Sequence, residues 1–271
     1  MRIKIRDITM EHEDLGTRTP LLFIHGYPLN RHLWDEQVSE LSDIARVLAP
    51  DLRGHGGSDA VPGPYSMDLH AEDCQAFLDA LRVAQPVVLC GLSMGGYVAF
   101  AFYRKYPERV AGLLLAATRA GADSPEGKAN RDKAMALAKE KGVSAVVESM
   151  LPKMLSPNTY LSRPELVARV KAMMEGTSLD GVLGDLAGLR DRPDSTPTLA
   201  TIDRPALILH GADDQLIPAS EAEAMHAGIK GSQKEDPARR GTPAECGTAR
   251  GIQRGDAEIC MVVVIGKFEN A

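Results

Sequence analysis

Short runs of aliphatic residues alternate along the chain with longer segments in which apolar residues recur every three or four positions. The runs cover residues 21–26, 45–51, 86–91, 110–118 and 205–211. Each is almost continuously apolar, as expected for a strand that is covered on both faces. Residues 68–83 and 95–108, which lie between runs, have helical spacing. This alternation predicts βαβ units and a mostly parallel sheet with flanking helices.

Between residues 119 and 203 the strand pattern stops. Three or more helical segments, broken by Pro and Gly, fill this part of the chain. Such an insertion is expected to lie as a cap over the carboxyl edge of the sheet, where α/β proteins bind ligands. The sequence therefore predicts a core in two parts (1–118 and 204–229), a helical cap at 119–203 and an anomalous tail at 230–271.

Composition and charge narrow the class of protein. The chain has 271 residues, with Lys+Arg 31 against Asp+Glu 37 and a net charge of −6. This balance argues against nucleic acid as a partner. No apolar stretch approaches the ~18 residues of a membrane span, and the N-terminus lacks the apolar core of a signal peptide. Four cysteines without paired spacing fit a reducing compartment. We expect a cytoplasmic enzyme with no disulfide, no metal site and no membrane association.

A G-x-S-x-G motif, Gly91-Leu92-Ser93-Met94-Gly95, follows one predicted strand and opens a helix. Glycines at these positions let the backbone turn sharply, so that the serine oxygen is exposed at the helix N-terminus. The helix dipole and the free amide of Met94 then face an oxyanion formed there. In this context the motif predicts Ser93 as a nucleophile; a plain tight turn is the alternative.

Two loops carry further motifs. Residues 25–28 read H-G-Y-P after the first long apolar run, and residues 50–58 read P-D-L-R-G-H-G-G-S. With the serine motif, they make the chain resemble the α/β-hydrolase superfamily as far as the tail. The resemblance implies the α/β-hydrolase fold and makes the amide of Tyr27 the second oxyanion donor. It also implies that His25 and His55 brace loops and are not catalytic bases.

A candidate acid follows the last predicted strand, where residues 209–218 read L-H-G-A-D-D-Q-L-I-P. The family places its triad acid three residues after the Gly and four before the Pro. That position is Asp214, with Asp213 as the alternative. The acid orients the catalytic imidazole and stabilises its charged form. Because the serine precedes the acid in the chain, a histidine is expected after Asp214.

The expected histidine is missing. His226 is the only histidine after Asp214, and it lies in a helical stretch, whereas the family's base lies in a G-H-x-P-x-x-E-x-P loop. We interpret His226 as a helix-surface residue, with a role as base as the alternative. Residues 230–258 hold 11 charged residues and one large apolar residue, Ile252. This composition is typical of disorder, so the last strand and helix are predicted to be missing or replaced.

The tail reads as an out-of-frame translation. From Gly241 onward, the codons read in the neighbouring frame permit G-H-L-P-N-V-E-Q-P, the missing family motif, followed by an amphipathic helix. The predicted break lies between Ile229 and Gln233. A genuine last strand at 260–265 is the alternative.

Among the branches of the superfamily, the motifs and the helical cap are most similar to 3-oxoadipate enol-lactonase-like hydrolases. This resemblance implies hydrolysis of a small-molecule ester or lactone through Ser93, a His and Asp214, without a cofactor. Trp34 and Arg119 are candidates for the pocket wall. Arg119 would pair with a substrate carboxylate or form an ordinary ion pair at the cap base.

Without the histidine, we expect very weak activity, because the three residues act as a unit. A non-catalytic pseudo-hydrolase that binds a small acid or ester is the second hypothesis. The sequence carries no signal for an oligomeric state.

Overall fold

The central sheet has the strand order β1-β2-β4-β3-β5-β6-β7-β8 in the part of the chain that the computed structural model describes, residues 1–211 and 214–235. β1 pairs antiparallel with β2, and β2 with β4, while every other neighbouring pair is parallel. This arrangement confirms the predicted α/β class and its mostly parallel sheet. The strands are β1 (Arg2–Ile5), β2 (Ile8–Leu15), β3 (Pro20–Ile24), β4 (Arg46–Pro50), β5 (Val87–Leu92), β6 (Val110–Ala116), β7 (Ala206–Leu209) and β8 (Gln233–Glu235).

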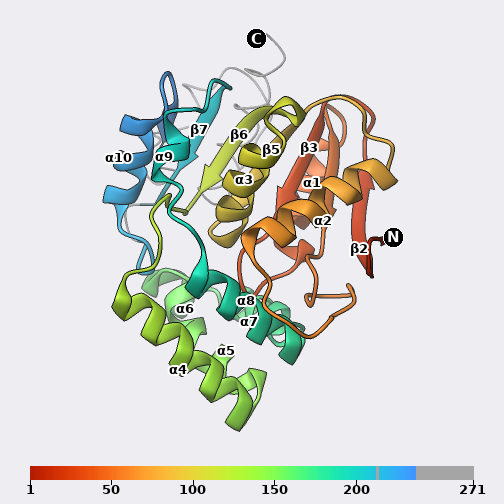
Figure 1. The fold of residues 1–271 in the computed structure, drawn as a ribbon. Coiled ribbons are helices and arrows are strands. Elements are labelled where there is room, and N and C mark those ends of the chain that lie inside the picture. The colour runs from red at the N-terminus through yellow and green to blue at the C-terminus, as the bar shows by residue number, and fades with distance from the viewer. Residues whose placement is uncertain (212–213, 236–271) are drawn as a thin grey trace.

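Helices cover both faces of the sheet because successive side chains of each strand point to opposite sides. On one face, Leu22 of β3 belongs to a core cluster with Phe77 of α2 (Met67–Ala80) and Val98 of α3 (Met94–Lys105). On the other, Leu21 packs in a cluster with Val38 of α1 (Asp35–Leu41). Figure 1 shows α2 and α3 side by side over the sheet.

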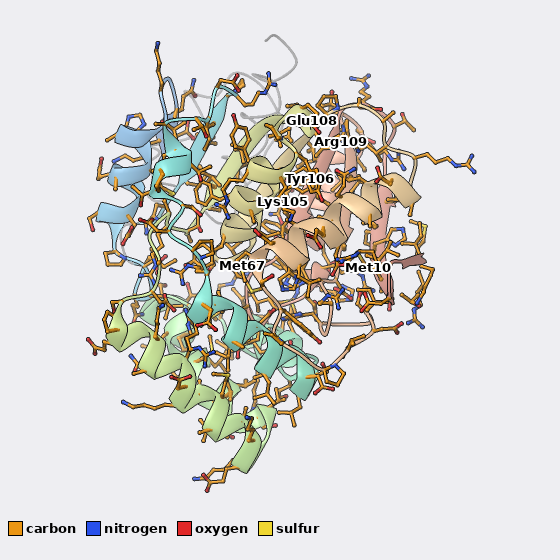
Figure 2. The ribbon with its side chains drawn as sticks, in the orientation of Figure 1. Met10, Met67, Lys105, Tyr106, Glu108 and Arg109 are labelled. Atoms are coloured by element: carbon orange, nitrogen blue, oxygen red, sulfur yellow. The ribbon has the colours of Figure 1, made fainter. Side chains whose placement is uncertain are left out.

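The connection after α3 turns back toward β6 at the edge of the sheet away from the cap. It runs through Tyr106 and the short 3-10 helix η2 (Pro107–Arg109), which Figure 2 labels together at that end of α3. Arg109 Nη2 donates a 2.7 Å hydrogen bond to the carbonyl of Val83. This bond fixes the loop that leads into β5, and therefore the strand that carries the serine motif.

A group of helices between β6 and β7 lies at the opposite end of the sheet from η2 (Figure 1). Serine side chains cap several of them: Ser124, for example, accepts from the amide of Gly127. The helices are α4 (Pro125–Lys141), α5 (Val143–Met154), α6 (Pro157–Ser162), α7 (Pro164–Glu175) and α8 (Leu179–Asp191), with α9 (Thr196–Leu199) leading back to β7.

The cap meets the core through direct backbone contact. A Cβ on Gly181 of α8 would lie 2.3 Å from the carbonyl oxygen of Gly54, and one on Gly188 would lie 1.7 Å from that of Tyr65. Only glycine allows so close an approach, because any side chain at these positions would collide with the loop that follows β4. The cap is thus seated over the carboxyl ends of the parallel strands.

The end of the described chain differs in part from the expectation for the tail. β7 is followed by α10 (Ala219–Gly228) and then by β8, which lies inside the predicted tail and pairs in parallel with β7, Ile208 opposite Lys234. No hydrophobic pattern marks this strand, because Gln-Lys-Glu at a sheet edge needs no apolar residue. Residues 236–271, with the candidate strand at 260–265, lie outside the described residues. No helix among the described residues is long and apolar enough to span a membrane.

Candidate active site

Ser93 occupies the sharp turn between β5 and α3, with φ 52° and ψ −110°. A positive φ is strained for a residue with a side chain, so the surroundings must hold it. The Ser93 amide donates to the carbonyl of Ala116 at 2.9 Å, and the Ser93 carbonyl accepts from Thr118 Oγ1 at 2.8 Å. Ala116 is the last residue of β6 and Thr118 lies two residues beyond it, so the end of the neighbouring strand holds the turn.

The glycines of the motif permit this turn. A Cβ on Gly91 would lie 2.4 Å from the carbonyl oxygen of Gly95, and a Cβ on Gly95 would lie 2.1 Å from that of Ile24. Because neither glycine has a side chain, α3 can begin one residue after β5 and pack directly against the end of β3. The serine is thereby presented at the carboxyl edge of the sheet.

Two backbone amides are available beside Ser93. Within the described residues, neither Tyr27 nor Met94 donates a hydrogen bond from its N–H group. Met94 is the first residue of α3, where helical N–H groups have no internal acceptor and the helix dipole favours negative charge. These are the two amides that the sequence predicts for the oxyanion hole.

The loop that carries Tyr27 is held by His25. The buried ring donates from Nδ1 to the carbonyl of Gly26 at 3.1 Å, and its Nε2 accepts from the amide of Leu52 at 2.9 Å. Burial, reinforced by the neighbouring ring of His55, lowers the pKa of His25 to about 3. His25 is therefore neutral with both nitrogens engaged, as expected for a residue that braces a loop.

Asp214 is fixed by the turn that follows it. Its Oδ1 accepts from the amides of Leu216 and Ile217 at 2.8 and 3.0 Å. Its Oδ2 lies 3.6 Å from Nε2 of the buried His210, which donates to the carbonyl of Ile217 at 2.9 Å. Asp213, the alternative acid, lies outside the described residues.

Ser93 and Asp214 line the same cavity, which has a volume of about 180 Å³. The amide-bearing residue Tyr27 also lines it. The cap contributes residues 153–156 at the end of α5, and the acid loop contributes residues 215–217. The structure thus brings Ser93, the predicted acid and one of the two predicted oxyanion residues together around one cavity beside the cap.

Comparison with known proteins identifies the family. A family model described as the alpha/beta hydrolase fold matches residues 19–239. The chain belongs to the α/β-hydrolase family. It is 28% identical over 222 residues to 3-oxoadipate enol-lactonase 2 of Acinetobacter baylyi, which is 81% of this chain and 81% of that protein.

Solved structures agree with this assignment. A thermophilic esterase from Thermogutta terrifontis, solved with malate bound, is 40% identical and has a TM-score of 0.84, over 86% of this chain and 88% of its own. The enol-lactonase from Burkholderia xenovorans LB400 has a TM-score of 0.84 over 100% of both chains at 21% identity, which shows a shared fold.

The histidines of this chain do not contribute to the Ser93 cavity. The sequence holds seven, and all are among the described residues. None of the seven lines the cavity at Ser93. His226 is exposed on α10, with Nδ1 2.9 Å from Ser232 Oγ. His210 is near the acid, but its hydrogen bond to the Ile217 carbonyl makes it part of the acid loop. Ser93 and Asp214 therefore line one cavity to which no imidazole contributes.

The two candidates for the pocket wall do not line this cavity. Trp34 packs against Phe23 with ring centroids 4.9 Å apart and belongs to the core under α1. Its position as an isolated aromatic residue near a motif gave no indication of which way the ring points. Arg119 pairs with the buried Asp123, which corresponds to the ion-pair alternative. Thr118, which donates to the Ser93 carbonyl, was not among the predicted residues, although its place two residues after β6 is a usable signal.

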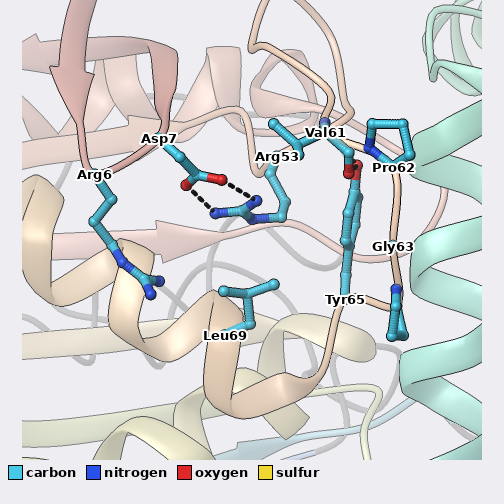
Figure 3. A pocket seen from close by; sticks show the side chains of 9 residues that line it. Arg6, Asp7, Arg53, Val61, Pro62, Gly63, Tyr65 and Leu69 are labelled. Atoms are coloured by element: carbon cyan, nitrogen blue, oxygen red, sulfur yellow. Dashed lines mark hydrogen bonds and ion pairs between the residues drawn. The ribbon is translucent and has the colours of Figure 1, made fainter.

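A second hollow of about 330 Å³ lies elsewhere, between the β1–β2 turn and the start of α2. Figure 3 shows Asp7 paired with the guanidinium of Arg53, and Tyr65 forming a wall. Arg53 is 3% exposed and also pairs with the buried Asp73 at 2.6 Å. The charge of Arg53 is thus balanced by Asp7 and Asp73. No serine, cysteine or histidine lines this hollow among the described residues, so it offers no nucleophile for acyl transfer.

Proposed function

We propose that this chain is a serine hydrolase of small carboxylic esters or lactones, with Ser93 as nucleophile and Asp214 as acid. The observation that carries the proposal is the strained Ser93 turn facing a cavity that Asp214 also lines. The named activities of its relatives, an enol-lactonase and an esterase, support the same class of substrate.

The chemistry follows from the placement of the groups. The Ser93 oxygen attacks the carbonyl carbon of the ester, and the negative charge that develops on the carbonyl oxygen is stabilised by the amides of Tyr27 and Met94. The acyl group is then released to water. The cavity limits the acyl group to a small one, because it measures only about 180 Å³.

Turnover by the chain as written is expected to be slow, because no histidine side chain faces Ser93. General-base catalysis contributes about 10²–10⁴-fold. The same observation supports a second candidate function, a pseudo-hydrolase that binds a small acid or ester without turning it over. The frame shift in the tail is our explanation for the missing base.

The test compares three proteins on phenyl acetate: the chain as written, its Ser93→Ala variant, and a chain whose tail is restored to the neighbouring frame. We expect the restored chain to gain at least about 100-fold over the chain as written and to lose this gain on Ser93→Ala. Ordinary turnover by the chain as written would show that another base serves Ser93. Ligand-dependent thermal stabilisation with no hydrolysis by any of the three would favour the pseudo-hydrolase.

We place the protein in the cytoplasm on the basis of its thiols. Cys74 and Cys90, the two cysteines among the described residues, are both buried and unpaired. Burial raises the pKa of each thiol above its ordinary value, so both are unreactive. Their free state fits a reducing compartment.

A further inference from the structure

We infer that the cavity between Ser93 and Asp214 is a binding site for a free imidazole-type base, and that such a base switches on Ser93-dependent hydrolysis in the chain as written. This inference rests on the proposed function. It adds a class of ligand, namely five-membered rings with one N–H donor and one unprotonated nitrogen. It also adds an activity that depends on that ligand.

The acid presents one free oxygen. Oδ1 of Asp214 is occupied by the amides of Leu216 and Ile217. Oδ2 is 3.6 Å from His210 Nε2, beyond hydrogen-bond length, and the proton on that nitrogen is directed to the Ile217 carbonyl. Oδ2 is therefore left to accept an N–H group from a ring in the cavity, and the fixed turn keeps this oxygen in place.

The nucleophile is equally unengaged. Among the described residues, no side chain or backbone group forms a hydrogen bond with Ser93 Oγ, although the backbone of Ser93 is held on both sides. A ring that donates to Asp214 would place its second nitrogen on the other side of the ring. That nitrogen can accept the serine proton, which is the arrangement that a triad histidine provides.

The space suits a small ring. A cavity of about 150 Å³ is sufficient to hold benzene, and imidazole is smaller than benzene, whereas this cavity measures about 180 Å³. Lys153 and Gln215, at the cap and acid-loop sides of the cavity, are both exposed. They leave the site open to entry from solvent.

The reaction balances with water as the only other reactant. The unprotonated nitrogen takes the proton of Ser93 Oγ–H as the oxygen bonds to the ester carbonyl carbon, while the imidazolium is held by Asp214. The imidazolium returns the proton to the departing alkoxide, which leaves as the alcohol. Water then attacks the acyl-serine with the ring as base, which releases the acid and regenerates Ser93.

The experiment measures phenyl acetate hydrolysis by the chain as written against imidazole concentration, with the rate of the Ser93→Ala variant subtracted at each concentration. We expect the Ser93-dependent rate to rise at least about tenfold, a fraction of the ~10²–10⁴-fold that a positioned general base contributes, and to saturate as the site fills. N-methylimidazole is the matched control base, because it accepts a proton but has no N–H to donate to Asp214. We expect it to give no saturating rate.

A second arm tests the acid. In Asp214→Asn the side-chain oxygen remains with the two amides, so the NH₂ group takes the place of Oδ2 and repels the ring N–H. This variant should lose the imidazole response, whereas Glu140→Gln, an exposed change on α4, should retain it. Urea unfolding of each variant shows whether it is folded.

Three outcomes overturn the inference: a response that is linear in imidazole, one that is equal in Ser93→Ala, or one that N-methylimidazole matches. If imidazole has no effect while the frame-restored chain is active, the base site fails and the proposed hydrolase stands. If both are inactive, the proposed function itself fails.

Discussion

His70 Nε2 on α2 donates a 2.7 Å hydrogen bond to Asp185 Oδ1 on α8, and neither side chain has any exposed surface. The other carboxylate oxygen lies 3.2 Å from Nε2 of the buried His55. His55 in turn lies against His25, with ring centroids 4.9 Å apart. A buried carboxylate of α8 is therefore linked through the ring of His55 to His25, the residue that braces the Tyr27 loop.

Asp185→Leu should destabilise the protein by about 3–5 kcal/mol, because it removes one partner from a buried polar cluster. Asp185→Asn keeps an acceptor for His70 and should cost less. Urea unfolding measures both. Asp191→Asn, at the exposed end of the same helix and paired with Arg190, is the control and should cost at most about 1 kcal/mol. Equal losses for Asp185→Leu and Asp191→Asn would show that the cluster contributes nothing.

Gly95→Ala should damage the serine turn itself. The new Cβ would lie 2.1 Å from the carbonyl oxygen of Ile24, a backbone atom that moves only with β3. We expect a loss of about 1–3 kcal/mol, typical of overpacking, and a lower activity in the frame-restored chain. Gly121→Ala, where the Cβ meets no atom within 4 Å, is the matched control. If the two alanine variants unfold at the same urea concentration, α3 does not press on β3 as described.

Stability should fall on mild acidification. Burial lowers the pKa of His25 to about 3, against about 6.5 in an unfolded chain. Below pH ~6.5 the unfolded chain therefore binds a proton that the folded protein excludes. The stabilisation is fully present above that pH and is lost as the pH falls toward 3. This group alone contributes a slope of up to ~1.4 kcal/mol per pH unit, measurable by urea unfolding between pH 6.5 and 5.

The matching variant is His25→Gln, whose amide oxygen can still accept from Leu52. It should flatten the slope only in part, because burial also lowers the pKa values of His55 and His12, and both remain in the variant. A His25→Gln slope equal to that of the parent would contradict the assignment.

Three arginines share the buried Asp123. Although burial acts against it, the hydrogen bond from Arg192 and the charge of Arg131 hold the pKa of this carboxyl below its ordinary value. Arg192, 2% exposed, also stacks on Tyr97 at 4.2 Å. Arg192→Met should therefore cost about 3–5 kcal/mol, whereas Arg119→Met, at a 24% exposed side chain, should cost about 1 kcal/mol or less. Thermal unfolding of the two variants measures which loses more stability, and a larger loss for Arg119→Met than for Arg192→Met would refute the prediction.

The sequence predicted the parts of the site that depend on backbone geometry. Ser93 and the amides of Tyr27 and Met94 lie in turns that glycines and strand ends mark, and such marks are local in sequence. The burial of Asp185 could not be predicted, because a single acidic residue in a helix belongs to no sequence pattern that indicates burial. The direction of the Trp34 side chain could not be predicted for a related reason. It depends on packing against Phe23, which is eleven residues away in the chain and whose position is set by the sheet.

The predicted parts of the site follow one another along the chain, from the Tyr27 loop and Ser93 to Asp214 after β7. Every described contact that strains and holds Ser93 comes from residues before β7. Under the frame shift that we propose, a change confined to the end of the chain would remove the base and leave Ser93 held in its strained turn. For a lineage of such enzymes, the last segment is where an activity can be silenced, or replaced by dependence on a small molecule, without rebuilding the protein.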